Sequence, residues 1–187
     1  MFVCLFVCLF AGSANATLID FGGLSTGFYS GHSEDGFSVS NTLGDWIVSG
    51  FGNPDPSIYA TTATASVQVT DLTTGFFSLS NVDFTANNLG STFTIIGSLS
   101  GSELFNFGGV LNTDNVQTSW DSISNSFSGT VIDSLDISFS VAGSSVNIDN
   151  ISVFSAENPN SVPEPTSLVL LGLGLAGLGF SRRKKTA

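Results

Sequence analysis

The chain has 187 residues, of which only 10% are charged, and its formal net charge is −11 at neutral pH. This length leaves room for one ordinary domain with short appendages, since a domain takes roughly 100 to 200 residues. All four basic residues lie at positions 182–185, and the chain before them carries no Lys or Arg. Nucleic acid is therefore excluded as a partner, because phosphate binding needs Lys or Arg to displace counterions. Divalent cations, neutral sugars and basic proteins remain compatible with this charge.

The N-terminal residues have the features of a secretory signal. An apolar run over residues 2–11 is followed by Ala14 and Ala16, which form an A-x-A cleavage pattern. The run is too short to cross a bilayer, which requires roughly 20 apolar residues. We therefore expect residues 1–16 to be a signal peptide that is cut after Ala16. Both cysteines, Cys4 and Cys8, lie within the signal peptide and would be removed with it, so the mature domain would contain no disulfide.

Residues 17–155 alternate apolar and polar side chains over short segments bounded by turn residues, which is typical of half-buried antiparallel strands. The absence of amphipathic helices between these segments favours a jelly-roll-like β-sandwich, an all-β fold. The expected strands cover residues 18–21, 37–40, 45–49, 66–71, 75–79, 81–86, 92–99, 103–107, 135–141 and 146–154.

Two of these strands change the parity of their apolar residues midway. Phe77 and Leu79 are odd whereas Phe84 is even, and a similar change follows Ile148. An extra residue must be accommodated, so we expect β-bulges at 80–81 and 149–150. First and last strands of such sandwiches commonly lie near each other, which would bring Asp20 towards Asp149.

The C-terminal region begins with a proline-rich linker at 156–162 and continues into an apolar run at 168–180. A helix over 165–181 would be about 25 Å long, slightly shorter than a typical hydrocarbon core. Arg182, Arg183, Lys184 and Lys185 follow directly. The positive-inside rule places these four residues in the cytoplasm and the β domain on the opposite side of the membrane. We expect a short transmembrane helix within residues 163–187.

Val162, Pro163, Glu164 and Pro165, followed by the short apolar segment and the basic cluster, resemble the PEP-CTERM sorting signal of Gram-negative bacteria. The resemblance implies processing by an exosortase and delivery to the cell surface or an exopolysaccharide matrix. It also implies that Pro163, Glu164 and Pro165 are recognition elements. The protein would be anchored in the inner membrane before processing. An ordinary C-terminal anchor is the alternative interpretation.

Side chains suited to catalysis are scarce, because the mature domain would have one His, no Cys and no Lys or Arg. We therefore expect a non-catalytic protein. A glycoside hydrolase, which needs two carboxyl groups about 5 to 10 Å apart, is the less favoured alternative, with Glu34, Asp35 and Glu103 as its candidates.

Two groups of residues are candidates for ligand contact. The segment 31–36 contains His32, Glu34 and Asp35 between two expected strands, so it is either a binding loop or a solvated turn. Trp46, Tyr59 and Trp120 could form a platform for sugar rings or could pack in the core, and Tyr59 follows a probable loop.

The opening segment 18–21 and the closing segment 148–153 together resemble, in strand order, the jelly-roll carbohydrate-binding modules. Terminal strands of such modules often hold a structural Ca²⁺, which implies Asp20 and Asp149 as ligands here. Hard oxygen ligands suit Ca²⁺, and the ion would relieve repulsion among unpaired acids. The sequence thus predicts an exported surface or matrix protein associated with exopolysaccharide or biofilm, with a Ca²⁺-dependent carbohydrate-binding module as the alternative.

Overall fold

A computed structural model describes residues 16–87, 90–111, 119–124, 126–140, 146–159 and 172–175. The chain divides into two compact units, Met1–Glu157 and Asn158–Ala187. In the second unit, the described residues 172–175 are helical. Nowhere in the described ranges is there a helix with the length and apolarity to span a membrane. The expected transmembrane helix falls mostly on residues outside these ranges, and so does the signal peptide apart from Ala16.

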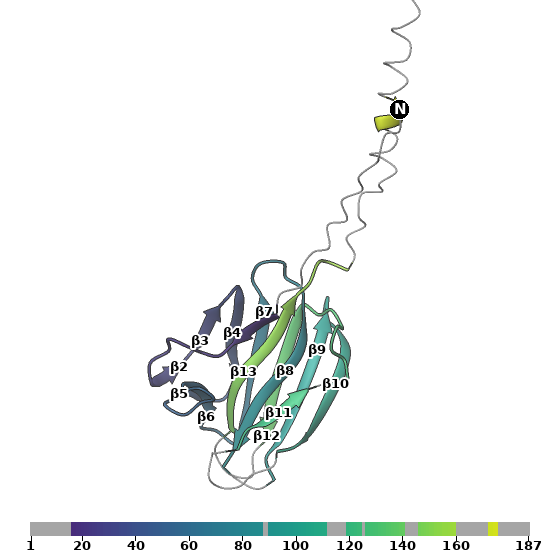
Figure 1. Ribbon diagram of the computed structural model, residues 1–187. Helices are drawn as coiled ribbons and strands as arrows, with labels where there is room; N and C mark the ends of the chain where they lie inside the picture. Colours follow the sequence, from purple (N-terminus) through teal and green to yellow (C-terminus); the bar gives the residue numbers. More distant parts are fainter. Residues whose placement is uncertain are drawn as a thin grey trace, which may run out of the picture. The chain divides into compact units, whose positions relative to one another are not determined.

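The first unit is a sandwich of two antiparallel β-sheets (Figure 1). One sheet has the order β11-β8-β13-β6-β5-β2, with β1 also paired to β13, and the other has the order β10-β9-β12-β7-β4-β3. This confirms the all-β sandwich. The strands are β1 (Ala16–Ile19), β2 (Gly27–Tyr29), β3 (Gly31–Glu34), β4 (Phe37–Leu43), β5 (Trp46–Ser49), β6 (Ser57–Ala60), β7 (Thr64–Asp71), β8 (Phe77–Ala86), β9 (Thr92–Leu99), β10 (Ser102–Val110), β11 (Asp121–Ser124), β12 (Ser134–Ser140) and β13 (Val146–Ser155).

The core lies between the sheets and is built from the alternate apolar residues of each strand. On β12, for example, Leu135, Ile137 and Phe139 are buried while the residues between them are not. Phe84 of β8 packs edge-on against Phe139 of β12, with ring centroids 5.1 Å apart, and thereby joins the two sheets. Burying alternate residues is the most direct way for a strand to contribute to a core, since successive side chains point to opposite faces.

Two hairpins have a two-residue turn in which both central residues have positive φ. Asp35 and Gly36 connect β3 to β4 with φ values of 47° and 86°, and Ser100 and Gly101 connect β9 to β10 with values of 51° and 76°. Such turns match the twist of the flanking strands and favour Asp-Gly and similar pairs. The expectation of a loop over 31–36 is therefore corrected, because residues 31–34 form β3. The short strands β2, β6 and β11 were also not expected.

Both expected β-bulges are present in the β8–β13 pair. Between the partners Asp149↔Asp83 and Ser152↔Asn81, β13 has one more residue than β8, and between Ser152↔Asn81 and Val153↔Leu79 the extra residue is on β8. Asn150 has a φ of 47° at the first bulge. The bulges keep apolar residues in the core on both sides of the irregularity and turn Asn150 towards the outer face of the sheet.

Candidate functional site

The first polar cluster forms where the chain leaves β1 and contacts Glu34 of β3. The backbone N–H of Phe21 donates to Glu34 Oε2 over 3.1 Å, and His32 Nε2 lies 3.4 Å from the same oxygen. Burial, followed by a hydrogen bond to Asp20 and its charge, raises the pKa of Glu34. The structure thus brings Asp20, His32 and Glu34 together. Asp35, in contrast, is exposed in the β3–β4 turn.

The second polar cluster lies on the outer face of the seven-stranded sheet. Asp83 and Asp149 are directly opposite each other on β8 and β13 and are 7% and 0% exposed. Asn150 Nδ2 donates to Asp83 Oδ2 over 3.0 Å and to the Asn53 carbonyl over 2.6 Å. The Asn53 N–H in turn donates to Asp149 Oδ2 over 2.6 Å. Two buried acids therefore help to hold the loop at 50–56 against the sheet.

The second cluster contains acidic groups that lie close together, and this affects the pKa of Asp149. Burial, together with the charges of Asp83 and Asp20, raises the pKa of Asp149 to about 7, although hydrogen bonds from the N–H groups of Asn53 and Asn150 oppose the rise. The effect of Asp20 agrees with the pairing of β1 and β13, which places Ile19 opposite Ile151. The inferred proximity of Asp20 to Asp149 is therefore confirmed. No Lys or Arg precedes residue 182, so these carboxylates have no cationic side chain in the domain to neutralise them.

The oxygen atoms of this cluster are chemically suited to bind a hard cation, but the cluster has too few acidic side chains to hold one by carboxylates alone. Asp83 Oδ1 and Asn150 Oδ1 are buried oxygens without a hydrogen-bond donor, and oxygens of this kind are suitable ligands for Ca²⁺. Within the described ranges, however, no group of three or more His, Cys, Asp or Glu is arranged to hold a metal ion. Any ion here would depend on amide and carbonyl oxygens in addition to the carboxylates.

The aromatic candidates occupy different environments. Trp46 is fully buried in the core, where its indole N–H donates to the Leu43 carbonyl over 3.0 Å, so it cannot contact a ligand. Tyr59 is half-buried on the outer face of β6. Trp120, also half-buried, directly precedes β11. Strands β6 and β11 are three strand spacings apart in the sheet, or about 14 Å, so a single sugar ring cannot stack on both Tyr59 and Trp120.

Two of the acids considered for hydrolysis, Glu34 and Glu103, are too far apart to form a catalytic pair. Glu34 lies on β3 and Glu103 on β10, the two opposite edges of the six-stranded sheet. Five strand spacings of about 4.8 Å separate them by roughly 24 Å, far beyond the distance that glycoside hydrolysis uses.

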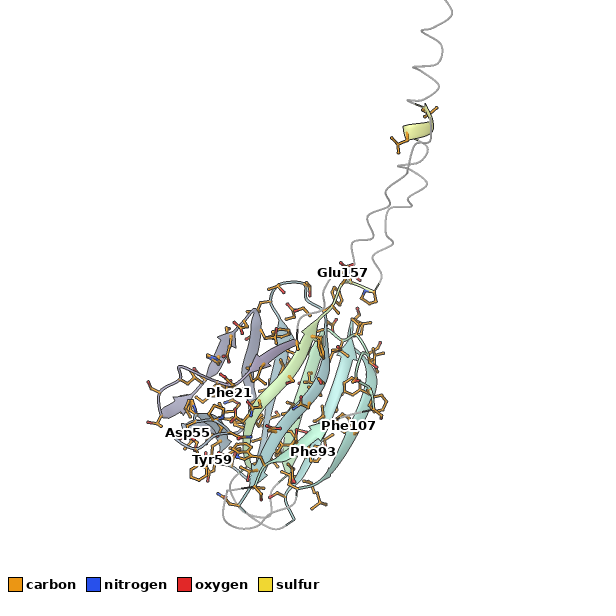
Figure 2. The ribbon with its side chains drawn as sticks, viewed as in Figure 1. Phe21, Asp55, Tyr59, Phe93, Phe107 and Glu157 are labelled. Carbon is orange, nitrogen blue, oxygen red and sulfur yellow. The ribbon has the colours of Figure 1, made fainter. Side chains whose placement is uncertain are left out.

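The outer face of β2, β5 and β6 carries Tyr59 together with Phe28 and Ile47, which the sequence analysis does not single out. Phe28 lies opposite Ile47, Ile47 opposite Tyr59, and Tyr59 opposite Asn147. Phe28 is 76% exposed and Ile47 is 37% exposed. Figure 2 shows Tyr59 on the side of the domain formed by these strands, with Asp55 nearby and Phe93 and Phe107 on the other side. The signal that could have found this face is the alternation of Phe28 and Ile47 with the core residues Tyr29 and Trp46.

The candidate sorting residues lie outside the described residues. They comprise Val162, Pro163, Glu164 and Pro165, the basic cluster Arg182, Arg183, Lys184 and Lys185, and the cleavage residue Ala14. Ala16 is the first residue of β1 and lies opposite Phe154 of β13.

Comparison with solved structures finds several likenesses at low sequence identity. A family 29 carbohydrate-binding module from Piromyces equi has a TM-score of 0.48 and 10% identity, covering 80% of this chain and 96% of that chain. The family 11 carbohydrate-binding module of the Clostridium thermocellum cellulase Lic26A-Cel5E has a TM-score of 0.41 and 16% identity, covering 80% and 100%. A DUF4465 family protein from Bacteroides caccae has a TM-score of 0.41 and 12% identity, covering 76% and 100%. None of these likenesses bears on a ligand for this chain, and a search of curated proteins gave no match.

The described β-sandwich is acidic and is followed in the chain by a short segment with a family match. Residues 161–184 match the PEP-CTERM protein-sorting motif. This chain is therefore an exported protein of the kind that an exosortase sorts to the cell surface.

Proposed function

We propose that this protein is a non-catalytic component of the cell surface or extracellular matrix, released from its C-terminal segment by an exosortase and associated with exopolysaccharide. The observation that carries the proposal is the sorting motif at 161–184, which directly follows the sandwich domain. The wide separation of Glu34 and Glu103 supports the non-catalytic role. The lack of Lys and Arg before residue 182 favours a neutral polymer over an anionic one.

The proposal is tested by the C-terminus of the secreted protein. Mass spectrometry of the mature form is expected to show loss of everything beyond the Pro163–Pro165 region. Replacing Pro163, Glu164 and Pro165 by Ala should leave the full chain in the membrane fraction, whereas Pro159→Ala in the preceding linker should be processed normally. An intact Ala187 in the membrane fraction of the wild type would show that the segment is a plain anchor.

A calcium ion at the acidic cluster is a separate proposal, and it is the feature that would make glycan binding Ca²⁺-dependent. Its support is the pair of buried, donor-free oxygens on Asp83 and Asn150, which lie beside Asp149. Asp149 and Asp20 would supply further oxygens. When bound, the ion would neutralise acids that otherwise repel one another. Glycan binding with and without EDTA distinguishes a Ca²⁺-dependent module from a protein that binds without the ion.

Hydrolysis of the exopolysaccharide by this protein would contradict the non-catalytic role. Purified protein incubated with the exopolysaccharide of the producing bacterium is expected to release no reducing sugar. Release that disappears on changing a single Asp or Glu would establish a glycoside hydrolase instead.

A further inference from the structure

A continuous row of side chains crosses the outer face of the seven-stranded sheet. Its members come from successive strands in direct cross-strand register: Phe28 on β2, Ile47 on β5, Tyr59 on β6 and Asn147 on β13. The neighbours of these residues along each strand, such as Tyr29, point into the core. The register therefore fixes the row on the side facing away from the second sheet.

The row is apolar and accessible at one end and polar at the other. Phe28 and Ile47 are exposed, and Phe51, in the segment that follows β5, is 41% exposed. Large side chains with this exposure are unfavourable in water, and a group of them commonly marks a binding surface. At the other end, Asn147 Nδ2 is buried without a hydrogen-bond acceptor, while Asn147 Oδ1 accepts from Ser57 Oγ over 3.1 Å. An unpaired donor thus lies beside Tyr59.

The charges around the row determine whether a neutral or an anionic polysaccharide can bind there. Asp45 precedes β5 and Asp55 lies in the loop before β6, and both are exposed. No Lys or Arg precedes residue 182, so an anionic polysaccharide would meet only repulsion on this face. A neutral polysaccharide meets none. Its hydroxyl groups can donate to Asp45 and Asp55, and its apolar ring faces can stack on Phe28 and Tyr59.

We propose that the row Phe28–Ile47–Tyr59 is the surface through which this protein binds a neutral polysaccharide. The inference rests on the proposed function, because it assigns a site and a charge class to the exopolysaccharide association. From Phe28 to Tyr59 the row crosses two strand spacings, or about 10 Å, so a short oligosaccharide lying across the strands would contact all three side chains.

The test uses the secreted, processed protein and the exopolysaccharide of the producing bacterium, separated by anion exchange into neutral and anionic fractions. Affinity electrophoresis in gels containing each fraction measures the dissociation constant. The wild type is expected to be retarded by the neutral fraction alone. Phe28→Ala and Tyr59→Ala should each weaken this binding roughly tenfold, which is the loss of about 1.4 kcal/mol of stacking. Tyr59→Phe, which keeps the ring, should retain most of it.

Control variants remove comparable exposed apolar side chains elsewhere. Leu104 and Val110 on β10, at the edge of the other sheet, are 45% and 66% exposed, and Leu104→Ala and Val110→Ala should bind like the wild type. A thermal melt of each variant checks that the domain remains folded. If the wild type binds the neutral fraction and Phe28→Ala and Tyr59→Ala bind equally well, the site is wrong while the proposed function stands. Binding of the anionic fraction alone overturns the proposed site while the exopolysaccharide association stands. Binding of no fraction, or only of a protein component of the matrix, overturns both.

Discussion

Asp83 and Asp149 face each other directly across the adjacent strands β8 and β13, and both carboxylates are buried. Two acids in this position cannot both be charged without cost, since burial and like charge disfavour the ionised form. Asn150 and the backbone of Asn53 hydrogen-bond to the pair and thereby attach the loop at 50–56 to the sheet. A proton on Asp149 or a bound cation would relieve this cost, and the two alternatives predict different behaviour in solution.

With EDTA present, the free energy of unfolding should fall as pH rises from about 4 to about 7. The pKa of Asp149 is about 7 in the folded state and 3.8 in the unfolded chain. The folded state therefore retains a proton over this range that the unfolded chain has released, and stability decreases by at most about 1.4 kcal/mol per pH unit. Urea melts at several pH values measure the slope. Asp149→Asn should make the slope shallower, whereas Asp35→Asn, in an exposed turn, should leave it unchanged. A slope of opposite sign would contradict the account.

Calcium should raise the melting temperature at pH 8, where the acidic cluster is most ionised. An ion that binds only the folded state at 100 times its dissociation constant adds about 2.7 kcal/mol to stability. Calorimetry with CaCl₂ and with EDTA measures the difference. Asp83→Asn should reduce it, and Asp35→Asn is again the control. If EDTA does not change the melting temperature, the calcium proposal is wrong.

Asp71 should stabilise the turn after β7 through its charge. Its Oδ1 accepts from the N–H and hydroxyl of Thr73, each over 2.6 Å, and its Oδ2 accepts from the hydroxyl of Thr74 over 3.0 Å. Although burial alone would raise the pKa of Asp71, hydrogen bonds from Thr73, Ser155 and the Thr74 N–H lower it to about 2. Asp71→Ala should cost about 2 to 3 kcal/mol in urea unfolding.

Because of the same contacts, the stability contributed by Asp71 should depend on pH in the acidic range, and the alanine variant should lack this dependence. Because the folded pKa lies below the unfolded value of 3.8, the contribution of Asp71 is present above about pH 4 and is lost as pH falls towards 2. Thr73→Ser, which keeps the hydroxyl, should behave like the wild type. An alanine variant as stable as the wild type at pH 6 would show that these hydrogen bonds contribute nothing net.

Gly97 should not tolerate even a methyl group. Phe105 lies opposite Gly97 on the neighbouring strand, and a Cβ at Gly97 would approach the Phe105 ring to 2.2 Å. Gly97→Ala must displace this buried ring, at a cost of about 1 to 3 kcal/mol. Gly50→Ala is the matched control, because its Cβ would meet only Thr26 at 3.5 Å. Equal thermal melts for the two variants would rule out this packing.

The sequence by itself determined the features that depend on local pattern. Strict alternation at 135–141 predicted β12, because a strand with one buried face must repeat every two residues. The changes of parity predicted both bulges for the same reason. The sorting motif was recognisable because its proline, apolar and basic parts are contiguous in the chain.

Only the tertiary structure decided which distant residues meet. Asp83 belonged to an expected strand and gave no sign of its burial, since nothing local specifies that Asp149 lies opposite it. Trp46 and Tyr59 are both aromatic, yet strand parity places Trp46 in the core and Tyr59 on the outer face. The row from Phe28 to Tyr59 exists because β2, β5 and β6 pair in register, and such pairing is a property of the whole sheet rather than of any segment.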